Sequence, residues 1–175
     1  MCRPSLHALP ALAAALAAAA LLSGCGGSSS SADAPPAGAA EVTVWFADDA
    51  GALVAETRPA PAGASSPLEA AVLALAEGPS APELLPALPP GTRVLGAGAA
   101  GGVATVDLSG EFETGYPAGG SAAELAVLAP LVRTAAEAAG AERVRILVEG
   151  RAPAPDGGQL DLSEPLSPDD VAAPG

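Results

Sequence analysis

The sequence predicts an α+β fold, a two-layer sandwich in which two helices pack on one face of a small sheet. Three observations support this fold class. Several short β-branched segments alternate apolar and polar residues, as strands with one buried face do. Two longer segments carry apolar residues at helical spacing, and each follows a capping motif. The resulting order is β-α-β-β-α-β over about 120 residues, which is enough to bury one core without disulfides.

The strands are placed by their alternation and by the turn residues that bound them. They are expected at residues 42–47, 53–58, 92–97, 103–108 and 143–149, with a small edge strand at 159–162. The third and fourth flank a Gly-rich bend and should pair as a hairpin. Beyond Pro165 no such pattern continues, so we expect a frayed end.

The first helix begins with a capping box at Ser66-Pro67-Leu68-Glu69 and stops at Gly78-Pro79. The second helix also begins with a capping box, at Ser121-Ala122-Ala123-Glu124, and it stops at Gly140. Pro130 inside the second helix removes one backbone hydrogen bond, so a kink near Ala126 or a divided helix is expected. The inward stripe of this helix is predicted to be Leu125, Leu128, Val132, Ala135 or Ala136, and Ala139.

The N-terminal residues have the features of a secretion signal with a lipid-attachment site. Arg3 precedes an apolar run from Leu6 to Leu22, and small residues lead to Cys25. The sequence Leu22-Ser23-Gly24-Cys25 resembles the bacterial lipobox, in which the Cys receives diacylglycerol and becomes the new N-terminus. Such an anchor carries two acyl chains, whereas one chain alone binds membranes only marginally.

These features divide the chain into four parts. Residues 1–24 are expected to be a lipoprotein signal peptide, and residues 25–40 a lipidated Cys with a flexible Gly/Ser/Pro/Ala tether. Residues 41–166 form the predicted folded domain, and residues 167–175 a disordered tail. The domain would lie at the outer face of the bacterial cytoplasmic membrane.

Charge and residue inventory exclude several classes of function. The chain has 20 acidic residues, 7 Lys plus Arg and a formal net charge of −13, so it cannot neutralise nucleic-acid phosphates. Cleavage before Cys25 removes Cys2 and His7, and lipid attachment uses the remaining thiol, that of Cys25, in a thioether. The expected mature domain therefore lacks Cys/His catalysis, His-ligated zinc and disulfides.

Two motifs suggest chemistry but fit structural roles better. Gly96-Ala97-Gly98-Ala99-Ala100-Gly101 matches G-x-G-x-x-G, yet a strand follows it where a dinucleotide loop would begin a helix. Asp107, Glu111 and Glu113 lie close in sequence, but their spacing is not that of a calcium loop. We therefore expect no catalytic residue, metal site or cofactor.

The aromatic residues are few, and two are candidates for an interaction surface. Trp45 falls on the opposite face of its strand from Phe46, so one of the two rings leaves the main core or lines a groove. Tyr116 is the second candidate for this surface. Core packing is the alternative role for both Trp45 and Tyr116.

Several ordered segments together resemble the GerMN domain, the sporulation and spore germination domain of bacterial lipoproteins. The segments that carry the resemblance are Val44-Trp45-Phe46, Leu53-Val54, Thr57-Arg58, LALAEGP at 73–79, LPPGT at 88–92, VATVDLSGEF at 103–112, Thr134 and VRILVEG at 144–150. The resemblance implies an extracytoplasmic α+β domain, similar to ring-building motifs, without known catalytic residues.

From these observations we expect a lipid-anchored, non-catalytic protein–protein interaction or assembly module in the cell envelope. Its partner is unidentified, self-association is open, and its setting is sporulation, germination or envelope homeostasis. Two alternatives stay open. One is a carboxylate-based hydrolase that uses Asp107 and Glu111, and the other is a small solute-binding lipoprotein. Against the second alternative, a single domain of about 120 residues lacks the two lobes that usually close on a solute.

Overall fold

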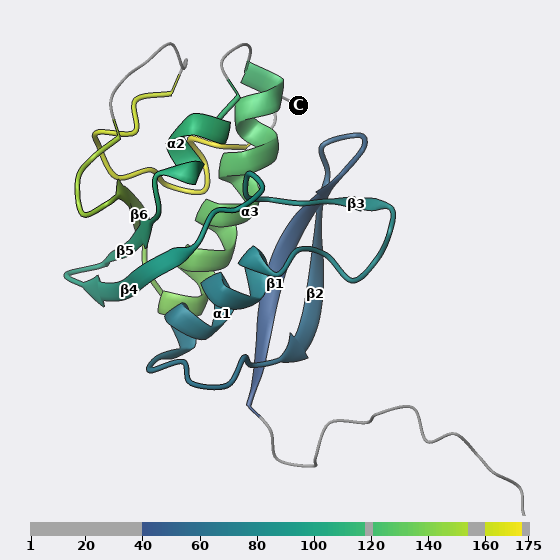
Figure 1. Ribbon diagram of the computed structural model, residues 1–175, viewed down its shortest axis with the longest axis horizontal. Coiled ribbons are helices and arrows are strands. Elements are labelled where there is room, and N and C mark those ends of the chain that lie inside the picture. The colour runs from purple at the N-terminus through teal and green to yellow at the C-terminus, as the bar shows by residue number, and fades with distance from the viewer. Residues whose placement is uncertain (1–39, 118–120, 154–159, 173–175) are drawn as a thin grey trace, which may run out of the picture. The chain divides into compact units, whose positions relative to one another are not determined.

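The computed structural model describes residues 40–117, 121–153 and 160–172. The elements are β1 (Glu41–Asp48), β2 (Leu53–Pro59), α1 (Pro67–Ala76), β3 (Leu84–Leu85), β4 (Val94–Ala100), β5 (Val103–Leu108), α2 (Glu111–Gly115), α3 (Ser121–Ala139) and β6 (Arg143–Val148). Figure 1 shows their course along the chain. Within the described ranges, none of the helices has the length and apolar character needed to cross a membrane. The predicted signal peptide, Cys25 and nearly all of the tether lie outside the described residues.

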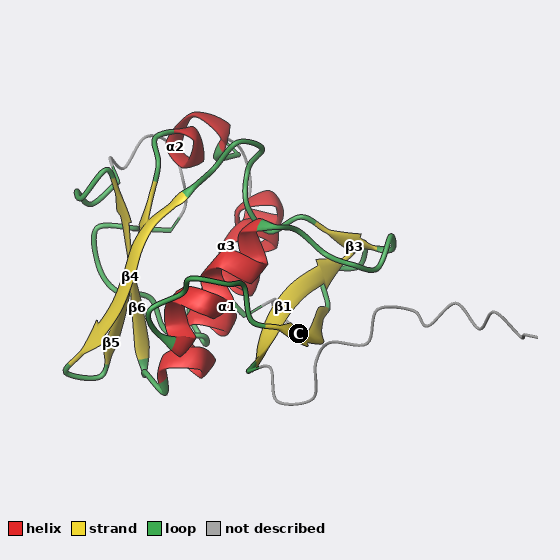
Figure 2. Cartoon of the chain, turned by 60° about the horizontal axis from the view of Figure 1, so that its bottom comes forward, coloured by secondary structure: helices red, strands yellow, loops and turns green. Residues whose placement is uncertain are grey.

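The α+β class is confirmed, but the strands form two sheets where one was expected. The sheets have the orders β2-β1-β3 and β4-β5-β6. Helices α1 and α3 lie between them, as Figure 2 shows: α1 contacts β1 and β4, and α3 contacts β1, β5 and β6. The physical reason is that α1 is buried on more than one side, with Leu68 and Ala71 on one side and Ala70 and Ala74 on another.

The first sheet is antiparallel. Its strand β1 pairs with β2 from Glu41↔Pro59 to Ala47↔Leu53, and it pairs with the short β3 only at its end. Val42, Val44 and Phe46 are buried, as the alternation predicts. The backbone N–H of Trp45 donates to Thr134 Oγ1 of α3 at 2.9 Å. A helix side chain thus satisfies a β1 donor that β3 is too short to reach.

The second sheet is mixed. The predicted hairpin is present as β4 and β5, with an irregularity in register between Val94 and Gly96. Strand β6 runs parallel to β5, and its residues Val144, Ile146 and Val148 are buried as expected. The off-pattern Leu147 is only partly buried because it lies on the outer face with Asp107.

Helix α1 begins and ends where its capping signals indicate. The Ser66 side chain accepts from the backbone N–H of Glu69 at 3.1 Å. In a complete capping box the Glu69 carboxylate would accept from the backbone N–H of Ser66. Here it accepts instead from the backbone N–H of Ser65 at 2.7 Å and from the Ser65 hydroxyl. At the other end Gly78 adopts a φ of +87°, the left-handed conformation that suits a helix stop.

A partly buried ion pair holds the chain after α1 against β2. Arg58 donates to the carbonyl oxygens of Ala74 and Gly78 at 3.1 and 3.0 Å, and it pairs with Glu56 at 2.5 Å. Glu56 also accepts from the backbone N–H groups of Ser80 and Ala81. Burial opposes ionisation of Glu56, but these hydrogen bonds and Arg58 outweigh it and lower the pKa of the carboxyl.

Helix α3 is a single helix from Ser121 to Ala139 with Pro130 inside it, so the predicted division is absent. The buried residues around Pro130 keep the segment helical despite the lost hydrogen bond. The buried face comprises Leu128, Leu131, Val132, Ala135 and Ala136, whereas Leu125 and Ala139 are only partly buried. Leu131 is the core residue that the predicted stripe omits.

The described C-terminal residues are ordered further than expected. Leu166 forms an antiparallel bridge with Val144, and Val171 is 2% exposed. The fold therefore continues past the predicted boundary at Leu166, because two isolated apolar residues dock on the core without forming a periodic element. The edge strand expected at 159–162 is absent over Leu160–Leu162, and residue 159 lies outside the described residues.

Candidate interaction groove

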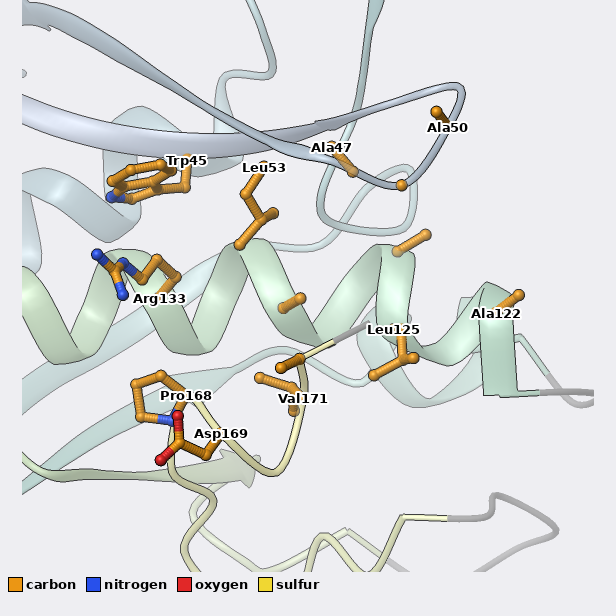
Figure 3. A pocket seen from close by; sticks show the side chains of 14 residues that line it. Trp45, Ala47, Ala50, Leu53, Ala122, Leu125, Arg133, Pro168, Asp169 and Val171 are labelled. Atoms are coloured by element: carbon orange, nitrogen blue, oxygen red, sulfur yellow. The ribbon is translucent and has the colours of Figure 1, made fainter. Parts of the chain in front are cut away.

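A groove of about 500 Å³ lies between the β1–β2 hairpin, α3 and the C-terminal segment. Figure 3 shows Trp45 and Leu53 pointing from the hairpin toward α3, with residues of the C-terminal segment on the other side of the helix. The lining residues are Trp45, Ala47, Ala50, Gly51, Leu53, Ala122, Leu125, Ala126, Ala129, Arg133, Pro168, Asp169, Val171 and Ala172. Most of these side chains are apolar.

The floor of the groove is a second apolar face of α3. Ala122, Leu125, Ala126 and Ala129 recur at intervals of three and four residues, so they share one side of the helix. The opposite side packs into the core through Leu128 and its buried neighbours. A surface helix ordinarily presents polar residues to solvent, so this apolar outer face is a candidate interaction site.

Trp45 is held at one end of the groove by two charged residues of α3. Its indole Nε1–H donates to Glu137 Oε2 at 3.0 Å, and the Arg133 guanidinium lies 4.9 Å from the ring centroid. Arg133 Nε and Glu137 Oε2 are 3.5 Å apart. These contacts fix the orientation of a partly exposed ring. Trp and Arg are also among the side chains most enriched at the energetic centres of protein interfaces.

Carboxylates lie at or next to two parts of the groove, the hairpin turn and the C-terminal segment. Asp169 is part of the lining, and Asp48 and Asp49 immediately precede the lining residue Ala50 in the hairpin turn. Asp48 Oδ1 accepts from the backbone N–H groups of Ala50 and Ala52 at 2.9 and 2.8 Å. Asp170 accepts from the Ser167 hydroxyl and backbone N–H, which lowers the pKa of its carboxyl. The groove therefore has a predominantly negative rim at neutral pH.

Tyr116, the second predicted surface residue, does not line this groove. Its ring packs against Phe112 with centroids 5.6 Å apart, and its hydroxyl is buried without a hydrogen-bond partner among the described residues. Burial, followed by the charge of Glu124, raises the pKa of Tyr116 to about 12. The phenol therefore stays protonated at neutral pH and contributes mainly to packing.

The carboxylates near the end of β5 hold turns together. Asp107 Oδ1 accepts from the backbone N–H of Gly150 at 2.9 Å, and Glu149 Oε1 accepts from that of Gly110 at 3.1 Å. Glu111 is exposed, and a hydrogen bond from Ser109 lowers the pKa of its carboxyl. Neither Asp107 nor Glu111 lines the groove. Across the described ranges, no group of three or more His, Cys, Asp or Glu is placed to hold a metal ion.

The G-x-G-x-x-G match lies in β4 and the turn to β5. Residues Gly96 to Ala100 pair with β5, and Gly101 and Gly102 form the turn with positive φ angles of +59° and +78°. Strand β5 follows the motif directly, where a dinucleotide loop would begin a helix. The structure therefore confirms a hairpin bend at this position.

Two parts of the groove are not predicted by the sequence analysis. The C-terminal wall comes from residues 168–172, which the sequence predicts to be part of a disordered tail, and Val171 is its main signal in the sequence. The helical floor could have been found, because the spacing of Ala122, Ala126 and Ala129 predicts a second apolar face of α3. Alanine is common on exposed helices, so this spacing is a weak signal without the neighbouring wall.

The chain is similar to known proteins both in sequence and in fold. A family model described as Germane, sporulation and spore germination, matches residues 43–153. The first GerMN domain of the sporulation protein GerM from Bacillus subtilis has a similar structure, with a TM-score of 0.57 and 24% identity. That match covers 75% of this chain and 99% of the other.

Two further solved structures are similar. The tandem GerMN domains of the same Bacillus subtilis protein match with a TM-score of 0.58 and 24% identity, over 75% of this chain and 47% of theirs. A candidate lipoprotein from Clostridium perfringens matches with a TM-score of 0.51 and 20% identity, over 75% and 89% of the two chains. No curated protein matches the chain. At these identities, the structural matches establish the fold.

Proposed function

We propose a function from one premise: the chain belongs to the Germane family of sporulation and spore germination domains, which confirms the resemblance carried by its motifs. On this premise it acts as a non-catalytic interaction or assembly module in the bacterial cell envelope. The observation that carries the proposal is the apolar groove, with a fixed Trp45 at one end and an apolar face of α3 as its floor. The groove is the docking site for another envelope protein.

The chemistry of the groove supports binding over catalysis. Among the described residues, its lining contains no Ser, Thr, Cys, His or Lys that could serve as a nucleophile, and its charged residues are Arg133 and Asp169. The hydrolase alternative loses its main support, because Asp107 is engaged with the Gly150 backbone and lies outside the groove. The solute-binding alternative keeps one supporting observation, since about 500 Å³ is within the usual volume range of small-molecule pockets.

Lipid attachment at Cys25 is part of the proposal. The Leu-Ser-Gly-Cys sequence supports it, and so does the fold shared with a candidate lipoprotein. Replacement of Cys25 by Ala should move the protein from the membrane fraction into the medium or the extracytoplasmic soluble fraction. Cys2→Ala is the matched control and should leave the protein in the membrane. Equal membrane retention of both variants would contradict the anchor.

The groove is tested by chemical crosslinking of the lipid-anchored protein in intact cells, followed by identification of captured proteins. Ala126→Gln places a longer side chain in the groove, whereas Ala123→Gln makes the same change at an exposed α3 position outside it. We expect Ala126→Gln to remove a defined adduct that the wild type and Ala123→Gln both form. An adduct that persists in Ala126→Gln would contradict docking at the groove.

A further inference from the structure

The groove on α3 is elongated, which favours a polypeptide segment as its occupant. Its floor extends from Ala122 to Arg133, about 16 Å at the helical rise of 1.5 Å per residue. Leu53 and Trp45 form one wall, and Pro168 and Val171 form the other, as Figure 3 shows. Several successive side chains of a peptide could therefore lie along the helix, and the small alanines allow its backbone to approach closely.

The negative charge around this floor favours a positively charged partner. Five carboxylates line or adjoin the groove, and the one guanidinium among the lining residues, Arg133, is paired with Glu137. The carboxylates are Asp48, Asp49, Glu137, Asp169 and Asp170. Asp49 and Asp169 are exposed, so their charges are available to an incoming molecule.

The charge of the whole chain acts in the same direction. With 20 acidic residues against 7 basic ones, the protein attracts cationic molecules from a distance. A second copy of the chain carries the same net charge, so electrostatics opposes its approach to the acidic rim. An anionic membrane surface is repelled for the same reason.

We infer that the groove takes a cationic, apolar polypeptide segment, with apolar side chains along α3 and Lys or Arg facing the rim of Asp48, Asp49, Asp169 and Asp170. This deepens the proposed function and rests on it, because it names the chemical class of the docking partner. The apolar contacts supply most of the affinity. The charges increase the rate of association and discriminate against acidic segments.

The test uses three synthetic peptides and the single tryptophan, Trp45, as a fluorescent reporter. The first peptide has Leu at positions i, i+3, i+4 and i+7 with Lys between them. The second replaces each Lys by Glu, and the third replaces each Leu by Ala. We expect the first peptide to bind at one site and change Trp45 fluorescence, with the other two at least tenfold weaker.

Variants then locate the binding. Ala126→Gln should weaken the first peptide at least tenfold, while Ala123→Gln should leave it unchanged. The double variant Asp49→Asn with Asp169→Asn should weaken it about four- to twentyfold, since each exposed charge pair contributes a modest factor. The control Glu77→Gln with Glu142→Gln removes the same charge elsewhere on the domain and should weaken it less than twofold.

Several outcomes separate the two proposals. Tighter binding of the acidic peptide, still abolished by Ala126→Gln, would overturn the charge class and leave the groove as the docking site. Equal loss of affinity in both double variants would also overturn the charge class, because the rim would then act only through net charge. Self-association that Ala126→Gln abolishes would identify a second copy as the occupant and refute the inference. Peptide binding unaffected by Ala126→Gln would contradict the groove itself.

Discussion

Replacement of Thr134 by Val tests how α3 positions the groove wall. Thr134 is fully buried, and its hydroxyl accepts from the backbone N–H of Trp45 at 2.9 Å. Valine keeps the branched shape and has nearly the same helix propensity, so the main change is loss of this acceptor. The variant therefore leaves the Trp45 N–H of β1 without its partner.

The expected cost follows from the surroundings of that bond. An unsatisfied buried donor destabilises the folded state by about 1–3 kcal/mol. This bond is only partly buried, so the lower half of the range, about 1–2 kcal/mol, applies. For a domain of this size, each kcal/mol lowers Tm by about 4 °C, which predicts a decrease of about 4–8 °C.

Urea unfolding, followed by far-UV circular dichroism and Trp45 fluorescence, measures the change. Thr57→Val is the matched control, because Thr57 is exposed on β2 and its replacement should change the free energy of unfolding by less than about 0.5 kcal/mol. If Thr134→Val is no more destabilising than Thr57→Val, the hydroxyl does not support β1 and the reasoning is wrong.

Three further predictions concern the rest of the domain. Glu56→Gln should lower the free energy of unfolding by about 1–3 kcal/mol at pH 7. Because the folded-state pKa of Glu56 lies below 4.5, this contribution is present above pH 4.5 and is lost as the pH falls through that lowered pKa, so wild type and variant should converge in acid denaturation curves. Tyr116 is the only tyrosine, and ultraviolet titration of the folded protein should give a phenol pKa of about 12. Since this pKa is raised, the corresponding stability is complete below pH 10 and is lost as the pH approaches 12; a titration midpoint near 10 would contradict burial of the hydroxyl. Gly78→Ala should cost about 1–2 kcal/mol in thermal or urea unfolding, because φ is +87° and no atom lies near the added methyl group; an unchanged Tm would show that the turn relaxes.

The strands and helix ends could be predicted because their signals are local. Alternation places Val144, Ile146 and Val148 on one face, and Ser66 and Gly78 mark the two ends of α1 by capping chemistry. The division into two sheets could not be predicted in this way. It depends on which strands pair over long sequence separations, and alternation is the same in either arrangement.

Helix α2, the C-terminal wall and the contacts of Trp45 also depend on packing that local sequence patterns do not show. Helix α2 spans only Glu111–Gly115, which is too short to show a repeating pattern of apolar residues, and the buried Phe112 anchors it to the core. The groove needs the C-terminal wall around Val171, where a single apolar residue docks without any repeating pattern. Trp45 could be proposed as a surface residue from its strand face, but its contacts with Arg133 and Glu137 depend on where α3 packs.

Docking of an envelope protein in the groove is tested most directly by site-specific photo-crosslinking in intact cells. A benzophenone side chain is placed at Ala122, which lines the groove, or at the adjacent Ala123, which does not. Both residues are exposed on the same helix, so reactivity and access are matched. We predict a defined protein adduct from position 122 and none from position 123. Equal adducts from both positions, or an adduct from position 123 alone, would contradict the groove as the interaction site.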